Sequence, residues 1–398
     1  MRIGQVTLDG YFNYGNILQK FALHHTLKKF SDDTEVLWFD GNKLFSEIGG
    51  GGKAQCVLFK ERRDWEKIFN LREAVRQSKF KDFENLHIKT RFDFPFMKDI
   101  ADEYDFIVVG SDQVWNPRWN PPYIFFDFVP REKKIAYAAS IGNPTIPDEK
   151  KETFRNGISD FNQLSVREEG TAKLINDLTG QTPIVLLDPI FLLTRDEWLA
   201  VAQKPTWFNE KYQRGYILTY YLRKLPPPEV KALAAKLNLP VINLLDVLNY
   251  NHFTTGPAEF VWLFANASLI FSNSFHGVGF SILFKRPFIN REIERDGSGV
   301  AMASRIVSLL QMFGLEDRRT SGEKVFSAQE ALTIDFTRRD KVLPRERVKA
   351  FKFLSEALSE ELRSEKIHVG GGHITSVNLL RIFVCSLLLF TIESLQRR

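Results

Sequence analysis

The feature of this chain that most limits its fold is a repeated alternation of short β-rich segments with helical segments. It opens with an extended segment at 2–7, a turn-rich loop at 9–16 and a helical pattern from Ile17. We expect further strands at 35–39, 105–109, 134–141, 164–167, 184–187, 216–222, 240–245 and 267–271, and a helix at 229–237. Because this order produces parallel sheets, the pattern predicts an α/β protein. The cycle restarts after a seam near 188–210, which predicts two such units.

The chain has 398 residues, enough for two domains that each bury a core. We predict a first domain at 1–188 and a second at 189–345. A closing helix is expected at 346–368, and a glycine-linked apolar tail at 369–398. The basic stretch from Phe59 to Leu86 is expected to form a pair of amphipathic helices.

Composition excludes several classes of protein. The net charge is only +5, which does not indicate nucleic-acid binding but suits an anionic small molecule or an anionic membrane surface. Two cysteines cannot build a disulfide framework, and no metal-binding motif is present, so we expect neither metal nor other cofactor. The N-terminus lacks a secretory signal pattern, so we expect a cytoplasmic protein, with the inner face of the membrane as an alternative location.

The strongest candidate for chemistry is His276. The residues Ser272–Gly277 follow a buried strand and precede a short apolar helix. Ligands of open α/β sheets bind at the carboxyl ends of strands, and a helix N-terminus there attracts anions. Gly277 would let the backbone approach a ligand closely. The alternative is a core histidine that its surroundings merely satisfy.

Polar residues also follow strands of the first half. Asn13 and Asn16 come after the first strand, and Asp112 and Gln113 after the strand at 105–109. Arg167 ends a short strand, where its guanidinium could clamp an anion. Structural alternatives exist for each: a turn at Asn13, a helix cap at Asp112, a surface charge at Arg167.

Seven motifs in order give the chain a resemblance to a known family: NYGNILQ, GSDQVWN, YAASIG, SVREEG, LLDPIFLL, GPAEF and SNSFHGVGFSILFKRPF. Over roughly residues 1–320 the chain resembles the polysaccharide pyruvyl transferases. The resemblance implies two Rossmann-like domains facing across a cleft, the GT-B arrangement, with the acceptor on the first domain and the donor on the second. It also implies transfer of pyruvate, as a ketal, from phosphoenolpyruvate to hydroxyls of a cell-surface glycan, an exopolysaccharide or a lipid-linked oligosaccharide.

The same resemblance assigns residues. It makes His276 the catalytic histidine. Donor-binding residues would be Arg167, Asn273, Ser274, Gly277 and Arg305, and acceptor-binding residues Asn13, Asn16, Asp112, Gln113 and Trp115. The family's Arg-Leu-His-Gly pattern has an arginine where this chain has Ser274. The cations that could replace it are Lys285, Arg286, Arg291 and Arg305.

Two other functions fit the same sequence. One is a glycosyltransferase of the same fold, which would bind the base and ribose of a nucleotide sugar in the second domain. The other is a catalytically silent glycan-binding relative that lost the arginine of the R-x-H pattern. A melting-temperature shift with a nucleotide sugar and none with phosphoenolpyruvate would indicate the first. Glycan binding without turnover would indicate the second.

We predict that residues 374–392 provide peripheral membrane contact and do not stabilise the core. The segment is almost wholly apolar and follows the glycine break at 370–372, but Arg381 near its centre makes a full membrane span costly. Truncation after His368 should leave the melting temperature nearly unchanged and reduce liposome binding. A large fall in melting temperature would show that the tail belongs to the core.

Overall fold

The computed structural model describes residues 1–8, 10–11, 13–38, 65–92, 101–118, 124–222, 225–291, 300–322 and 324–359. Residues 1–358 form one compact unit and residues 359–398 a second. Within the described ranges no helix has the length and apolar character that crossing a bilayer requires. The apolar segment at 374–392 lies outside them.

The first β-sheet has seven parallel strands in the order β3-β2-β1-β4-β5-β6-β7. Its strands are β1 (Ile3–Val6), β2 (Thr34–Leu37), β3 (Thr90–Arg91), β4 (Phe106–Val109), β5 (Lys134–Ala139), β6 (Gln163–Val166) and β7 (Ile184–Val185). The order reverses between β1 and β4, as it does in Rossmann folds. Ligands of such sheets bind at this switch point, beyond the carboxyl ends of the strands.

The second sheet has five parallel strands in the order β12-β11-β10-β8-β9. Its strands are β8 (Ile217–Tyr220), β9 (Val241–Leu244), β10 (Leu269–Ser272), β11 (Phe288–Arg291) and β12 (Arg319–Thr320). Here the order reverses between β8 and β10, the pattern of flavodoxin-like sheets. The chain therefore has two Rossmann-like sheets, which confirms the predicted α/β class.

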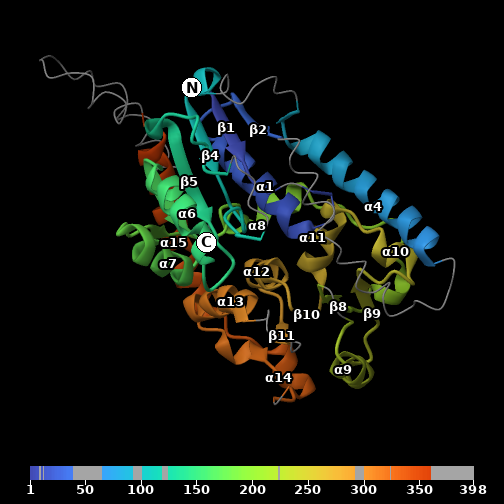
Figure 1. Ribbon diagram of the computed structural model, residues 1–398. Helices are drawn as coiled ribbons and strands as arrows, with labels where there is room; N and C mark the ends of the chain where they lie inside the picture. The colour runs from blue at the N-terminus through green and yellow to red at the C-terminus, as the bar shows by residue number, and fades with distance from the viewer. Residues whose placement is uncertain are drawn as a thin grey trace, which may run out of the picture. The chain divides into compact units, whose positions relative to one another are not determined.

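Helices connect the strands of both sheets (Figure 1). They are α1 (Tyr14–Leu27), α4 (Trp65–His87), α6 (Lys151–Ser159), α7 (Glu169–Thr179), α8 (Arg195–Ala200), α9 (Glu229–Leu237), α10 (Tyr250–Phe253), α11 (Pro257–Asn266), α12 (Phe275–Leu283), α13 (Val300–Phe313), α14 (Ala328–Leu332) and α15 (Thr337–Ala357). A 3-10 turn, η4 (Pro189–Phe191), follows β7.

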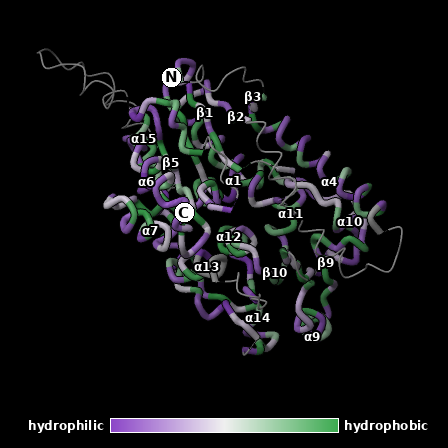
Figure 2. Tube along the Cα trace, viewed as in Figure 1, coloured by the Kyte–Doolittle hydropathy of each residue, from purple (hydrophilic) through white to green (hydrophobic). Residues whose placement is uncertain are grey.

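Two sequence predictions about helices need correction. The stretch predicted as a helix pair contains, in its described part, the single helix α4, whose polar and apolar residues alternate (Figure 2). The closing helix predicted from residue 346 begins earlier, at Thr337, and continues through Pro344. Proline lacks the N–H that donates the hydrogen bond inside a helix, so a proline is usually taken as a helix boundary. For this reason the sequence predicted a start after Pro344. The domain boundary at 188 stays a prediction.

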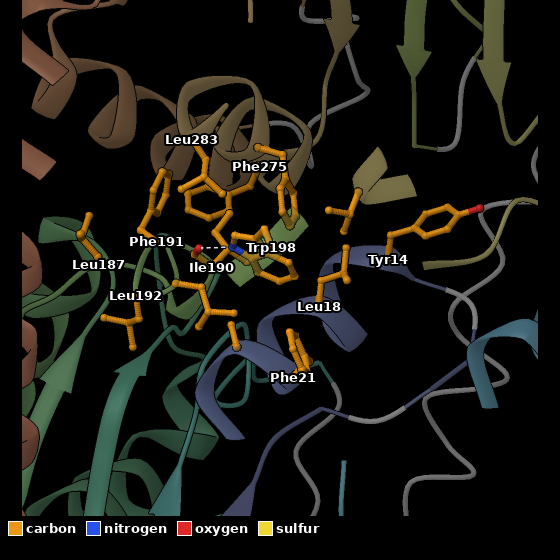
Figure 3. Close-up of a cluster of buried hydrophobic side chains, with 14 of the residues drawn as sticks. Tyr14, Leu18, Phe21, Leu187, Ile190, Phe191, Leu192, Trp198, Phe275 and Leu283 are labelled. Carbon is orange, nitrogen blue, oxygen red and sulfur yellow. Dashed lines mark hydrogen bonds between the residues drawn. The ribbon is translucent and has the colours of Figure 1, made fainter. Parts of the chain in front are cut away.

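Helix α1 joins the two halves of the fold. Its residues Leu18 and Phe21 pack in one apolar cluster with Trp198 and with Phe275 of α12 (Figure 3). Tyr14, at the start of α1, donates a hydrogen bond to the carbonyl of Thr255 at 2.6 Å and is fully buried. The first turn of α1 is therefore anchored on the second half of the chain.

Helix α15 secures the segment between the two sheets. Arg347 donates to the carbonyls of Phe191 and Leu193 at 2.6 and 2.7 Å. Burial lowers the pKa of Arg347 to about 10, with the charge of Arg339 adding to the effect. These bonds satisfy carbonyls directly after η4, the turn that leads the chain out of the first sheet.

Candidate active site

His276 lies where the sequence predicted, in the first turn of α12 just beyond β10. Ser274 caps the helix, since its hydroxyl accepts from the N–H of Gly277 at 3.5 Å, and its own N–H donates to Ser272 Oγ at 3.0 Å. These bonds fix the turn between strand and helix. The imidazole is 6% exposed, so it faces protein on nearly every side.

The imidazole of His276 lies beside the carboxylate of Asp188. The Oδ2 atom of Asp188 lies 3.5 Å from Nε2 of His276 and accepts a 2.8 Å hydrogen bond from Nη1 of Arg167. Its other oxygen, Oδ1, accepts from the N–H of Ile190 at 3.1 Å and so caps η4. One carboxylate thus contacts both the predicted catalytic histidine and a predicted donor-binding arginine.

Arg167 is surrounded by carboxylates of the protein itself. Besides Asp188, its guanidinium lies 3.3 Å from Asp112 Oδ1 and 3.5 Å from Glu168 Oε2. It also lies over the ring of Phe275, 4.4 Å from the ring centroid. Burial opposes the charge of Arg167, but the three carboxylates outweigh it and raise the pKa. Arg167 donates hydrogen bonds to Asp188 and Asp112, while its buried Nε has no hydrogen-bond partner. Its charge is therefore compensated within the protein more fully than its hydrogen-bonding capacity.

Arg305 of α13 reaches the same cluster with fewer partners. Its Nη1 lies 3.7 Å from Asp112 Oδ1, beyond hydrogen-bond distance. With the Gln113 amide oriented to suit its neighbours, the amide oxygen accepts from Nη1 and Nη2 of Arg305 at 3.1 Å. The buried Nε has no hydrogen-bond partner. Burial lowers the pKa of Arg305 to about 10, and the charge of Arg167 lowers it further. A bound anion would therefore stabilise the charge of Arg305 more than it would stabilise the charge of Arg167.

The electrostatics of Asp188 follow from its two cationic neighbours. Burial raises the pKa of its carboxyl group, but the interactions with His276 and Arg167 outweigh burial and lower the pKa to about 2. Asp188 is therefore an anion at every physiological pH. Because an anionic carboxylate can only accept hydrogen bonds, it presents an acceptor to the imidazole.

The other predicted donor-binding residues have structural tasks. Asn273 accepts from the N–H of Leu222 at 2.8 Å and donates to its carbonyl at 3.2 Å. This pair ties the end of β10 to the chain beyond β8, across the switch point. A Cβ at Gly277 would lie 2.2 Å from Ser272 Oγ, so this glycine allows close packing of helix on strand. Gly277 therefore makes room for the side chain of Ser272. The close approach of a ligand to the backbone of Gly277 stays a prediction.

The predicted acceptor-binding residues come together only in part. Asp112 and Gln113 contact Arg305, and no helix follows within 113–118 for Asp112 to cap. Asn13 caps α1 by accepting from the N–H of Gly15 at 2.8 Å, and Asn16 is buried on the first turn of that helix. Trp115 has no exposed area and packs on core aromatic rings, the position of a core residue.

The structure selects among the four cations that could replace the family's missing arginine. Lys285 pairs with Asp340 at 2.6 Å, and Arg291 pairs with Glu229 at 3.2 Å. Arg286 lies near Tyr216 and Arg195, and burial lowers its pKa. Of these four residues, only Arg305 joins the cluster of Arg167, Asp112 and His276.

Three residues of the cluster were not predicted as site residues: Asp188, Glu168 and Gly15. A Cβ at Gly15 would lie 2.0 Å from Nδ1 of His276, so only glycine fits against the imidazole there. Glu168 accepts from Ser140 Oγ at 2.6 Å. All three lie inside the motifs NYGNILQ, SVREEG and LLDPIFLL, which could have indicated them.

Among the residues that the structure describes, there is no cluster of histidine, cysteine and carboxylate side chains able to hold a metal ion. A pocket of about 70 Å³ lies away from the cluster, between α9, β11 and residues 324–326. Its lining includes Phe271, Arg291 and Lys324. Arg291 is one of the four candidate cations, and none of the residues predicted to bind donor or acceptor lines this pocket.

Comparison with known families agrees with this geometry. The family model described as polysaccharide pyruvyl transferase matches residues 13–292, more than half of the 398-residue chain. The chain therefore belongs to the polysaccharide pyruvyl transferase family, a family of transferases. No curated protein matches the chain significantly.

Solved structures resemble the chain more distantly. The UDP-GlcNAc 2-epimerase from Neisseria meningitidis, bound to UDP-GlcNAc, is 12% identical, with 89% of this chain and 100% of that one covered and a TM-score of 0.45. HepE of Anabaena, in complex with UDP, is 10% identical over 90% and 100%, with a TM-score of 0.43. The heptosyltransferase II of E. coli is 10% identical over 88% and 99%, with a TM-score of 0.33.

The lowered pKa of Asp188 makes a testable prediction about stability. Its charge stabilises the fold fully above the ordinary pKa of 3.8, and that stabilisation is lost as the pH falls through about 2. Urea unfolding of wild type and Asp188→Asn should therefore differ more near pH 5 than near pH 2, by roughly 2 kcal/mol. A difference that stays constant over this range would show that the ion pairs of Asp188 do not stabilise the fold.

Proposed function

We propose that this protein transfers the pyruvyl group of phosphoenolpyruvate to two hydroxyls of one sugar in a cell-surface glycan, an exopolysaccharide or a lipid-linked oligosaccharide. The observation that supports it most is the convergence of His276, Arg167 and Arg305 on two carboxylates, those of Asp188 and Asp112. An imidazole can move protons near neutral pH, and a guanidinium matches a carboxylate or a phosphate. Membership of the family supplies the reaction class.

The proposed reaction needs one proton carrier and no redox step. A sugar hydroxyl adds to C2 of the enol, and its proton goes to the terminal CH₂, which becomes CH₃. A second hydroxyl then attacks C2, the bond from C2 to the phosphate oxygen breaks, and phosphate leaves with the second proton. Phosphoenolpyruvate and a diol thus become a ketal carboxylate and hydrogen phosphate, with charge conserved. His276 would give a proton to the terminal carbon and then take the proton of the hydroxyl that attacks C2.

We assign the donor's anionic groups chiefly to Arg305. The cluster contains two guanidinium groups and three carboxylates, those of Asp112, Glu168 and Asp188. An anion is therefore not attracted by a general excess of positive charge. It is attracted where the charge of a cation is poorly compensated. Between the two guanidinium groups that cation is Arg305, whose ion pair with Asp112 spans 3.7 Å, whereas Arg167 has carboxylates at 2.8, 3.3 and 3.5 Å. Arg167 serves as a second contact through its position beside Asp112.

The remaining assignments follow the two halves of the chain. Residues of the first half near the switch point, Asn13, Asn16, Asp112 and Gln113, would face the acceptor. The donor would lie against the second half, at the start of α12, where the helix dipole favours an anion. Peripheral membrane contact through 374–392 would bring the enzyme to a lipid-linked acceptor on the inner face of the membrane.

The proposal makes a prediction about two variants, measured by phosphate release from phosphoenolpyruvate over a panel of glycans. His276→Asn should lower turnover by about 10²–10⁴-fold, the usual contribution of general acid–base catalysis, with a nearly unchanged melting temperature. Arg305→Lys should weaken donor binding by roughly tenfold to a hundredfold, because lysine keeps the charge but loses the planar fork.

The matched control is Arg291→Lys, which changes an arginine paired with Glu229 outside the cluster. It should leave donor binding unchanged. If Arg291→Lys weakened donor binding while Arg305→Lys did not, the donor would lie at β11 and not at the cluster. If a nucleotide sugar raised the melting temperature and phosphoenolpyruvate did not, glycosyl transfer would replace pyruvyl transfer as the function.

A further inference from the structure

The imidazole of His276 has different neighbours at its two nitrogens. Nε2 faces the carboxylate of Asp188 at 3.5 Å and has no hydrogen-bond partner at shorter distance. Nδ1 faces Gly15, at the start of α1. One nitrogen therefore points to an anion of the crossover segment, and the other to the loop and helix of the first half.

Asp188 can only act as an acceptor toward Nε2. Its Oδ1 is held by the N–H of Ile190 and its Oδ2 by Arg167, so the carboxylate cannot rotate away without losing both bonds. The tautomer of a neutral histidine is set by the partner of one ring nitrogen. A fixed acceptor at Nε2 favours a hydrogen there, which leaves the lone pair on Nδ1. The 3.5 Å separation is typical of catalytic pairs that tighten only when substrate binds.

Gly15 keeps side-chain atoms away from Nδ1. A Cβ at this position would lie 2.0 Å from Nδ1, 2.6 Å from Cγ and 2.7 Å from Cε1, closer than any real contact. Gly15 cannot withdraw easily, because its neighbour Tyr14 is buried and bonded to the carbonyl of Thr255. The first half of the chain, which carries the predicted acceptor residues, thus borders Nδ1 with backbone alone.

We propose that Asp188 and Gly15 position His276 so that Nε2 carries the hydrogen and Nδ1 exchanges the proton with the acceptor hydroxyl. This inference rests on the proposed function for the identity of that hydroxyl. The protonated imidazole gives the Nδ1 proton to the terminal carbon, whose new C–H bond uses the electron pair of the C2=C3 bond and leaves C2 electrophilic. The lone pair on Nδ1 then accepts the hydroxyl proton as the oxygen bonds to C2, so the imidazolium is regenerated. Asp188 stabilises the imidazolium before and after this exchange. Asp188 and Gly15 are positioning residues, since neither contacts the reacting atoms.

The direct test is ¹⁵N NMR of the protein labelled at histidine, at alkaline pH where imidazoles are ordinarily neutral. The His276 signals are assigned as those absent from His276→Asn. The expected result is the Nε2–H tautomer in wild type. In Asp188→Ala the acceptor that faces Nε2 is absent, so the preference for the Nε2–H tautomer should be lost. An Nδ1–H tautomer in wild type would overturn the proposal.

Turnover provides the second measurement. Asp188→Asn should lower turnover by about 10²–10⁴-fold, while the dissociation constant of phosphoenolpyruvate changes by less than about tenfold, since Arg305 still holds the donor. If instead the affinity for phosphoenolpyruvate fell by about 10²–10⁴-fold and turnover did not change, Asp188 would have a donor-binding role, which would contradict the assignment.

Gly15→Ala tests the other side of the ring, with Gly170→Ala as the matched control. Nothing lies within 4 Å of a Cβ added at Gly170, which is in α7. Gly15→Ala should shift the His276 signals and lower turnover, whereas Gly170→Ala should change neither. Unchanged His276 signals in a folded Gly15→Ala would contradict the contact.

The two proposals fail in different ways. If wild type releases no phosphate from phosphoenolpyruvate with any glycan, the proposed donor is wrong, but the NMR result still decides the tautomer. If phosphate is released and the tautomer is Nδ1–H, the function stands and the positioning role is wrong. If Asp188→Asn does not fold, the wild-type tautomer and the Gly15→Ala signals still decide the matter.

Discussion

A single buried carboxylate, that of Asp188, joins parts of this protein that are far apart in sequence. It accepts from Arg167, whose strand belongs to the first sheet, faces His276, whose helix follows a strand of the second, and caps the turn between the two sheets. Burying such a charge is costly unless it is paired and hydrogen-bonded. The carboxylate therefore requires both cationic partners at defined positions, and the geometry of the cluster follows from that requirement.

The topology explains why the cluster forms at this place. Each sheet reverses its strand order once, between β1 and β4 and between β8 and β10. The polar loops at the carboxyl ends of these strands lie at the two switch points, and α1 brings the first set to the second through Tyr14 and Gly15. Neither half contains the whole cluster. A relative displacement of the two sheets would separate Gly15 from His276 and Asp112 from Arg305.

The sequence predicted the fold better than it predicted the site. Helix α9 was predicted to the residue, and β1, β4 and β10 within two residues, because apolar periodicity and flanking turns define such elements locally. The position of His276 between a strand and a helix was predicted for the same reason, since both elements are next to it in sequence. Its catalytic role stays a prediction.

Long-range contacts could not be read in that way. Asp188 looked like the end of a short strand, and its two cationic partners are 21 and 88 residues away in sequence. Four cations were equal candidates to replace the family's missing arginine, and only the packing of α13 against the cluster separates Arg305 from the others. Trp115 was expected to bind the acceptor, but its ring is buried in the core of the first half.

The central claim is that the donor binds at this cluster, and a crystal structure with phosphoenolpyruvate tests it most directly. The account predicts the donor's phosphate or carboxylate on the guanidinium of Arg305 with its enol carbons beside His276. Phosphoenolpyruvate bound only in the pocket between α9 and β11, with the cluster unchanged, would contradict it.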